Sequence, residues 1–277
     1  MVKGNVLQIL TTVVFITELN GIFAFDYHHP ELWSKEQKEC AENRQSPVNV
    51  PRRKIKETLP NKLVISNYDT KPTGVKVTNN GHTVAFSPIY QLKKPSIQGG
   101  PLNGVYVLDS FHFHWGLSNA NGSEHTLDGR HYQLEMHLVH YKEGYGSMKG
   151  AMGKPDGLSV IGVFFSIPTT KNPKHSALDP IVNLLSKVKD VETTVNIPPF
   201  LLSTFGLQTP QTYVTYQGSL TTPPCSQVVT WLLSLAPHVV TNQQMQAFRA
   251  VKLEHLDKEN DRPQQPINRR VFKFVNT

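Results

Sequence analysis

Long hydrophobic runs are scarce in this 277-residue sequence, and only two cysteines are present, Cys40 and Cys225. The most apolar stretch, about residues 6–15, is too short to cross a membrane as a helix. No internal repeat, low-complexity tract or nucleic-acid-binding motif is present, and the C-terminal residues lack the apolar tail of a lipid anchor. We therefore expect no membrane span, no lipid anchor and no nucleic-acid partner.

Acidic residues are fewer than basic ones, which gives a formal net charge of +7. The basic residues are dispersed, and Arg52, Arg53 and Lys54 form the densest cluster. A solvated basic surface is the interpretation we favour, and an acidic extracellular matrix as partner is the alternative.

The N-terminus has the pattern of a secretory signal peptide. Lys3 precedes the apolar stretch, and small residues follow it up to Ala24. We predict a signal peptide over residues 1–24, with cleavage between about Gly21 and Phe25, and one domain over residues 25–277. A buried N-terminal strand is the alternative. The predicted location is extracellular, and the oligomeric state is left open.

A secreted chain with an even pair of cysteines predicts one disulfide, between Cys40 and Cys225. Two free buried thiols are the alternative. Asn121-Gly122-Ser123 matches the glycosylation acceptor pattern, so Asn121 is a candidate glycosylation site.

Short strand-like runs separated by Pro, Gly and Asn dominate the chain, and no linker divides it. We expect strands at 62–66, 74–78, 83–86, 105–115, 132–141, 159–167, 212–217 and 227–235. Helical spacing of apolar residues predicts a helix over 180–189, and Thr241 is a plausible N-cap for a second helix over 243–251. The sequence therefore predicts one mostly-β domain with peripheral helices.

Three histidines lie in a pattern that could hold a metal ion. Residues 111–115 read Phe-His-Phe-His-Trp, and alternate side chains of a strand share a face, so His112 and His114 point the same way. His137 lies in a second strand-like run. If the two strands are neighbours, three neutral imidazoles converge, which is typical of a catalytic zinc site with an open position. Satisfied core histidines are the alternative.

Further motifs accompany these histidines along the chain. They are Gln-Ser-Pro-Val-Asn-Val at 45–50, Asn-Asn-Gly-His at 79–82, Ser-Glu-His-Thr at 123–126, Glu-Met-His at 135–137, Gly-Ser-Leu-Thr-Thr-Pro-Pro-Cys at 218–225 and Val-Thr-Trp at 229–231. Together they resemble the α-class carbonic anhydrases, most closely the secreted animal members. The resemblance covers about residues 25–270.

This resemblance implies a large, mainly antiparallel, twisted central sheet with short peripheral helices. It also implies the zinc-dependent, reversible hydration of carbon dioxide to bicarbonate and a proton. In that reaction zinc-bound hydroxide attacks the substrate, and a histidine shuttles the proton away. His112, His114 and His137 match the zinc ligands.

The resemblance assigns roles to residues around the metal. Glu135 matches the carboxylate partner of His137, and Thr221 matches the acceptor of the hydroxide proton. Glu124 matches the acceptor of Thr221's own proton, and His82 matches the proton shuttle, as a group that titrates near neutrality. Without the resemblance, Thr221 reads as an ordinary turn residue, Glu124 as a solvated charge and His82 as a surface histidine.

The substrate is small and apolar, so it needs a dry wall beside the nucleophile. The residues that match this wall are Val139, Val160, Leu220, Val229 and Trp231. Thr222 matches a position close to bound bicarbonate.

Three residues depart from the family pattern. Ser110 stands where a Gln usually holds the first ligand, Ala85 replaces an amide, and Phe25 replaces a Trp. None is expected to touch the metal, so they bear on turnover and zinc retention rather than on the reaction.

Three other functions compete with carbon dioxide hydration. A catalytically silent binding module characteristically lacks a ligand histidine, whereas all three are present here. A secreted matrix or biomineral protein, whose binding role outweighs catalysis, would fit the basic surface. A different zinc hydrolase would need a carboxylate base such as that of His-Glu-x-x-His, and the sequence has no such motif.

Overall fold

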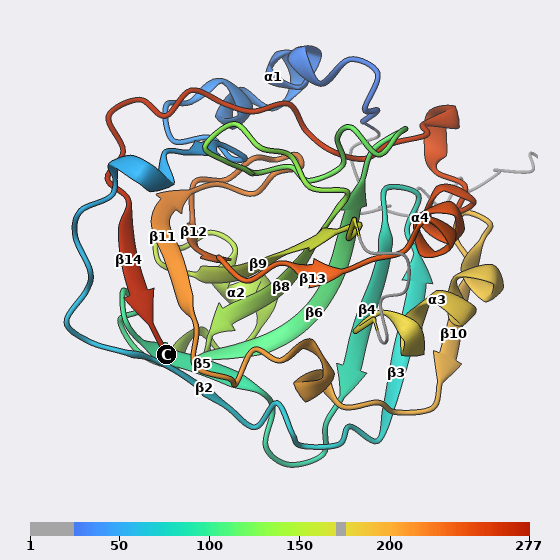
Figure 1. Ribbon diagram of the computed structural model, residues 1–277, viewed down its shortest axis with the longest axis horizontal. Helices are drawn as coiled ribbons and strands as arrows, with labels where there is room; N and C mark the ends of the chain where they lie inside the picture. The colour runs from blue at the N-terminus through green and yellow to red at the C-terminus, as the bar shows by residue number, and fades with distance from the viewer. Residues whose placement is uncertain (1–24, 170–175) are drawn as a thin grey trace, which may run out of the picture.

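The computed structural model describes residues 25–169 and 176–277. The predicted signal peptide, residues 1–24, lies outside the described residues. A twelve-stranded sheet runs through the molecule in the order β10-β3-β4-β6-β8-β9-β12-β11-β14, with β2, β5 and β13 attached beside it. In Figure 1 it extends from β10 on the right to β14 on the left. Neighbouring strands of this sheet are antiparallel except where β9 pairs with β12 and β13.

The strands are short apart from the central ones. Their bounds are β1 Asn49–Val50, β2 Leu63–Ser66, β3 Gly74–Asn79, β4 Val84–Ile89, β5 Ser96–Gly99, β6 Tyr106–Trp115, β7 Thr126–Leu127, β8 Leu134–Lys142, β9 Leu158–Ser166, β10 Thr194–Ile197, β11 Thr212–Gly218, β12 Val229–Ser234, β13 His238–Val239 and β14 Lys273–Asn276.

Helices are short and peripheral. The α-helices are α1 Trp33–Glu36, α2 Met148–Ala151, α3 Asp179–Leu185 and α4 Asn242–Arg249. The 3₁₀ helices are η1 Pro30–Leu32, η2 Lys38–Ala41, η3 Arg52–Lys54, η4 Glu143–Tyr145, η5 Ser186–Val188, η6 Leu202–Phe205 and η7 Glu254–Leu256. In the described part of the chain, none of these helices is long and apolar enough to span a bilayer.

The predicted fold class is confirmed, and all eight predicted strands are present within three residues of their expected ends. Both predicted α-helices end earlier than expected. The predicted helix over 180–189 is α-helical only to Leu185 and continues as η5, and α4 ends at Arg249 rather than 251.

The central strands β6, β8 and β9 are buried on both faces, and this rigid support positions the candidate site. On one face, Phe111, Phe113 and Trp115 belong to a large apolar core. On the other, Val139 and Val160 belong to a second apolar core. Because side chains alternate along a strand, His112, His114 and His137 project toward the second core.

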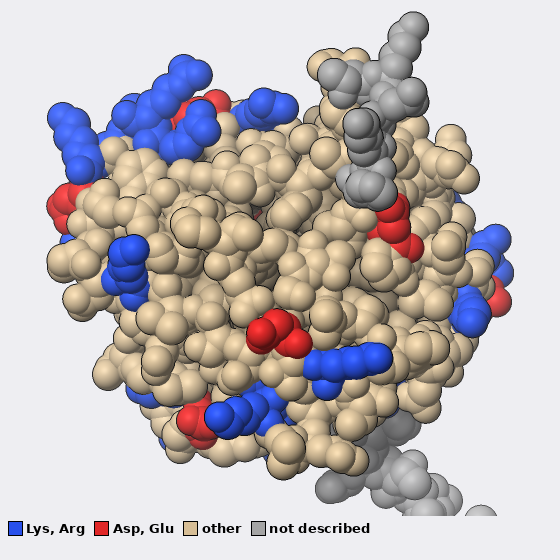
Figure 2. All heavy atoms as spheres, turned by 60° about the horizontal axis from the view of Figure 1, so that its bottom comes forward, with Lys and Arg blue, Asp and Glu red and all other residues tan. Residues whose placement is uncertain are grey.

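Charged side chains are spread over the surface. On the face drawn in Figure 2, Lys and Arg are most numerous toward one corner, with Asp and Glu beside them, and a smaller group of acidic and basic side chains lies below the centre. The densest basic cluster of the sequence is partly neutralised, since Arg52 and Arg53 lie 3.3 and 3.5 Å from the carboxylate of Asp128.

Candidate metal centre

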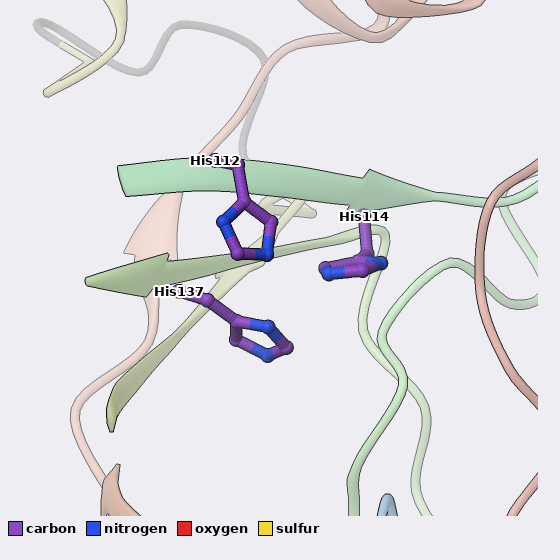
Figure 3. Close-up of side chains that lie close together, drawn as sticks. All are labelled: His112, His114 and His137. Atoms are coloured by element: carbon purple, nitrogen blue, oxygen red, sulfur yellow. The ribbon is translucent and has the colours of Figure 1, made fainter. Parts of the chain in front are cut away.

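The structure brings the three predicted ligands together. His112 and His114 lie on β6, and His137 lies on the adjacent strand β8 directly opposite His112. Their ring centroids are 5.0 Å apart for His112–His114, 5.3 Å for His112–His137 and 4.5 Å for His114–His137. Figure 3 shows the three rings gathered from the two neighbouring strands. One ring nitrogen from each lies within 4.8 Å of the others.

Two of the rings are held by their outer nitrogens, which leaves the inner ones free. His114 donates from Nδ1 to the carbonyl of Asn260 at 2.7 Å, and its buried Nε2 has no partner in the described chain. His137 donates from Nε2 to Glu135 Oε1 at 2.7 Å, so Nδ1 carries its lone pair. A buried nitrogen without a partner is costly unless a ligand occupies it.

The environment keeps all three rings neutral. Burial lowers the pKa of His112 to about 3, and the neighbouring His137 adds to this effect. Burial also lowers the pKa of His114 well below its usual range and lowers that of His137. Neutral imidazoles are the form that binds a metal ion.

Glu135 holds His137 through a fully buried network. Although burial opposes ionisation, contacts with His125 and His137 hold the pKa of the Glu135 carboxyl well below its usual range. Its Oε1 accepts from His125 Nδ1 at 2.7 Å, and His125 Nε2 lies 2.6 Å from the Tyr216 hydroxyl. The predicted partnership of Glu135 and His137 is thus present in the structure, and His125 supports it from behind.

These residues fit a zinc ion, and a set of three imidazoles without a carboxylate ligand is unlike the oxygen-rich sites of magnesium and calcium. Zinc takes imidazole nitrogens at about 2.0–2.1 Å and, in catalytic sites, three protein ligands with one position open. A carboxylate that accepts from the outer nitrogen of a ligand histidine is the usual way in which proteins orient such a ring. The free Nε2 of His114 and the ionised Glu135 behind His137 match both requirements.

Glu124 and Thr221 lie close together at the buried end of the site. The Glu124 Oε1 accepts from the Arg262 amide at 3.0 Å and lies 3.4 Å from His114 Nδ1. Burial raises the pKa of Glu124 well above its usual range, as does the charge of Glu135. The hydrogen bond from the Arg262 amide and the nearby Thr221 side chain oppose this rise in the pKa of Glu124. Thr221 therefore lies close enough to Glu124 to lower the pKa of its carboxyl group.

An apolar wall adjoins the histidines. Val139 and Val160 are directly opposite each other on β8 and β9, and Trp231 pairs with Val160 on the next strand. The Trp231 ring lies 4.8 Å from the ring of His137. All five predicted wall residues fall in or against one apolar cluster, namely Val139, Val160, Leu220, Val229 and Trp231. Thr222 is half-buried and follows Thr221 in the adjoining loop.

That loop is anchored by the predicted disulfide, which is present between Cys40 and Cys225 with a Cα–Cα distance of 4.9 Å. Gln45 donates to the Cys225 carbonyl at 3.1 Å, and Arg262 donates to the Cys40 carbonyl at 3.3 Å. The segment that carries Thr221 is therefore tied to the N-terminal part of the domain.

His82 lies in the turn after β3, and the structure places its ring against Phe25. The two rings are stacked, with centroids 3.9 Å apart. Asn260 links this turn to the metal centre, because its side chain donates to the His82 carbonyl at 2.9 Å while its own carbonyl accepts from His114.

Sequence reasoning missed Asn260 and Arg262, which lie in a stretch with no regular pattern. Asn260 makes five hydrogen bonds to backbone or ring groups around the site, and the buried Arg262 holds Glu124 through its amide. Only the family pattern at these positions could have signalled them, since neither lies in a periodic element.

Two other residues singled out by the sequence, Ser110 and Asn121, can also be located. The Ser110 hydroxyl donates to Asp109 Oδ2 at 3.0 Å rather than to His112, next to an irregularity in the β6–β8 pairing. Asn121 is half-buried and its neighbours Gly122 and Ser123 are buried, so its glycosylation stays a prediction.

Comparison with known proteins provides further evidence. Residues 28–275 match the model of the eukaryotic-type carbonic anhydrase family. The chain is 35% identical over 258 residues to carbonic anhydrase 3 of Equus caballus, covering 90% of this chain and 95% of that protein. It is also 35% identical to carbonic anhydrase 3 of Sus scrofa over 260 residues, with the same coverage, and of Homo sapiens over 256 residues, covering 89% and 95%.

Proposed function

The chain belongs to the eukaryotic-type carbonic anhydrase family, enzymes that hydrate carbon dioxide reversibly, and from this premise we propose a mechanism for its residues. Zinc held by His112, His114 and His137 is the cofactor, and His82 carries the product proton to solvent. The observation that carries the proposal is the partnerless, buried Nε2 of His114 among three neutral imidazoles.

Zinc, when bound, acts as a Lewis acid that makes hydroxide available near pH 7, an effect for which carbonic anhydrase is the standard example. Three neutral ligands leave the full double charge of the ion in place. Glu135 keeps the His137 ring oriented and its Nδ1 unprotonated.

Thr221 and Glu124 orient the nucleophile. In this proposal the Thr221 hydroxyl donates a hydrogen bond to Glu124, so its oxygen is left to accept a hydrogen bond from the nucleophile. The wall of Val139, Val160 and Trp231 excludes water from the space beside the nucleophile. A dry apolar space suits carbon dioxide, which has no hydrogen to donate. Carbon dioxide is therefore held by apolar contact, and bicarbonate leaves past Thr222.

Each turnover releases one proton, which needs a base that titrates near neutrality. His82 is the histidine that the pattern assigns to this step, and Asn260 ties its backbone to that of the ligand His114.

Removal and return of the metal test the function. We expect about one zinc per purified chain, hydration of carbon dioxide at neutral pH, loss of hydration after chelation and recovery on adding zinc. Hydration that persists at full rate in metal-free protein would refute the zinc assignment.

We also propose that the protein is secreted after cleavage of residues 1–24. The Cys40–Cys225 disulfide supports this location, because such bonds persist in oxidising compartments. N-terminal sequencing of protein from the culture medium of secreting cells tests the proposal. A mature protein that starts at Met1 and stays inside the cell would contradict it.

A further inference from the structure

His82 has an unusual position for a group that must carry a proton. Its ring is buried, with 7% of the residue exposed, and neither ring nitrogen has a hydrogen-bond partner in the described chain. Phe25 covers one ring face. Burial lowers the pKa of His82, because an imidazolium loses solvation there. A protonated shuttle in this place needs a compensating negative charge.

Glu254 at the start of η7 supplies that charge. Its Oε2 lies 3.7 Å from His82 Nε2, too far for a hydrogen bond but close enough for a strong Coulomb interaction. Two features fix this approach. The Glu254 amide donates to the Gly81 carbonyl at 2.8 Å, and the Glu254 side chain packs where a Cβ on Gly81 would lie. Gly81 has φ +86°, a conformation that favours glycine.

Two other charged groups near His82 are less suited to this role than Glu254. Asp257 also raises the pKa of His82, but its carboxylate already accepts from the Tyr27 amide at 3.0 Å and lies 3.1 Å from His28. His255 opposes protonation of His82 and lies 4.0 Å from Glu254. Glu254 is therefore the carboxylate that faces His82.

We infer that Glu254 is a positioning residue of the proton pathway, whose carboxylate is the charge partner of the protonated His82 ring. This inference rests on the proposed role of His82 as the shuttle. Glu254 does not touch the metal centre. It acts by making His82 a better proton acceptor.

The sign of the effect follows from the charge. A negative carboxylate favours the imidazolium, so Glu254→Gln should lower the pKa of His82. An acceptor with a lower pKa takes up a proton more slowly, so turnover in dilute buffer should fall by about two- to five-fold. Added imidazole should restore the rate, because it replaces the impaired acceptor.

The experiment is an NMR titration of the histidine rings in the purified full-length protein, with the His82 signal assigned by its loss in His82→Ala. Glu254→Gln is compared with Glu31→Gln, a matched control in which an exposed carboxylate lies 3.2 Å from another histidine, His29. Glu254→Asp retains the charge at a greater distance and should give an intermediate His82 pKa.

A lower His82 pKa in Glu254→Gln, with no change in Glu31→Gln, supports the pair. An unchanged His82 pKa in Glu254→Gln overturns it, whatever happens to turnover. The shuttle is tested separately by His82→Ala. If that variant keeps wild-type turnover in dilute buffer, the shuttle role fails, and with it any part of Glu254 in the reaction.

Discussion

In the proposed function, His82 is the residue that carries the product proton to solvent. We predict that His82→Ala slows hydration in dilute buffer by about one to two orders of magnitude, while the exchange of carbon dioxide with bicarbonate, which needs no proton release, stays nearly intact. Stopped-flow hydration and isotope exchange measure the two steps, and imidazole should restore the first. A variant with unchanged turnover at every buffer concentration would mean that the proton leaves by another route.

Ser110 is one of the three residues at which the sequence departs from the family pattern. Its hydroxyl donates to Asp109, so it does not hold the His112 ring. A glutamine could reach that ring, and losing such a partner typically costs about 10- to 100-fold in metal affinity or activity. We therefore predict that Ser110→Gln slows zinc loss to a chelator, with little change in the pH profile of hydration.

Zinc release at fixed pH and chelator concentration checks this prediction. Ser87→Gln, on the neighbouring strand β4 and away from the histidines, is a suitable control. Equal or faster release from Ser110→Gln would show that His112 is already held by another group.

At the scale of elements, α4 follows the rule that its sequence predicts. Thr241 accepts from the Gln244 amide at 3.1 Å and Gln244 reaches back to the Thr241 amide at 2.9 Å. Removing such a cap costs about 1 kcal/mol, so Thr241→Ala should lower the melting temperature by about 2–4 °C. Gln243→Ala, at an exposed position of the same helix, is the control. Equal melting temperatures for the two variants would contradict the cap's contribution.

Element by element, what could be predicted depended on periodicity. On the long strand β6 the period of two shows that His112 and His114 share a face. Adding His137 to them required β6 and β8 to be neighbours, which the structure shows. The short strands β5, β10 and β14 carry four residues each, too few for a pattern to stand out. Asn260 lies between elements, where only tertiary contacts give a residue its role.

At the scale of the whole molecule, the Cys40–Cys225 bond joins residues 185 apart in the sequence. The chain-entropy model gives roughly 5 kcal/mol for a loop of this length, and measured values are typically about 2–4 kcal/mol. We predict that the double variant Cys40→Ala/Cys225→Ala loses free energy of unfolding in this range, measured by urea denaturation. Coincident unfolding curves for the variant and the parent would show that the bond contributes no net stability.

The basic net charge is also a property of the whole molecule. Asp128 neutralises part of the densest basic cluster, and on the face drawn in Figure 2 acidic side chains lie beside the groups of basic ones. Binding to an acidic matrix therefore stays a prediction from composition, and the catalytic site is the more specific feature.

The most direct test measures zinc content and carbon dioxide hydration on the same preparations of wild type, His114→Ala and His131→Ala. His131 is an exposed histidine outside the site and serves as the control. We predict about one zinc per chain and full activity for the wild type and His131→Ala, and loss of both in His114→Ala with a native circular dichroism spectrum. A folded His114→Ala variant that keeps wild-type zinc and wild-type hydration would contradict the account.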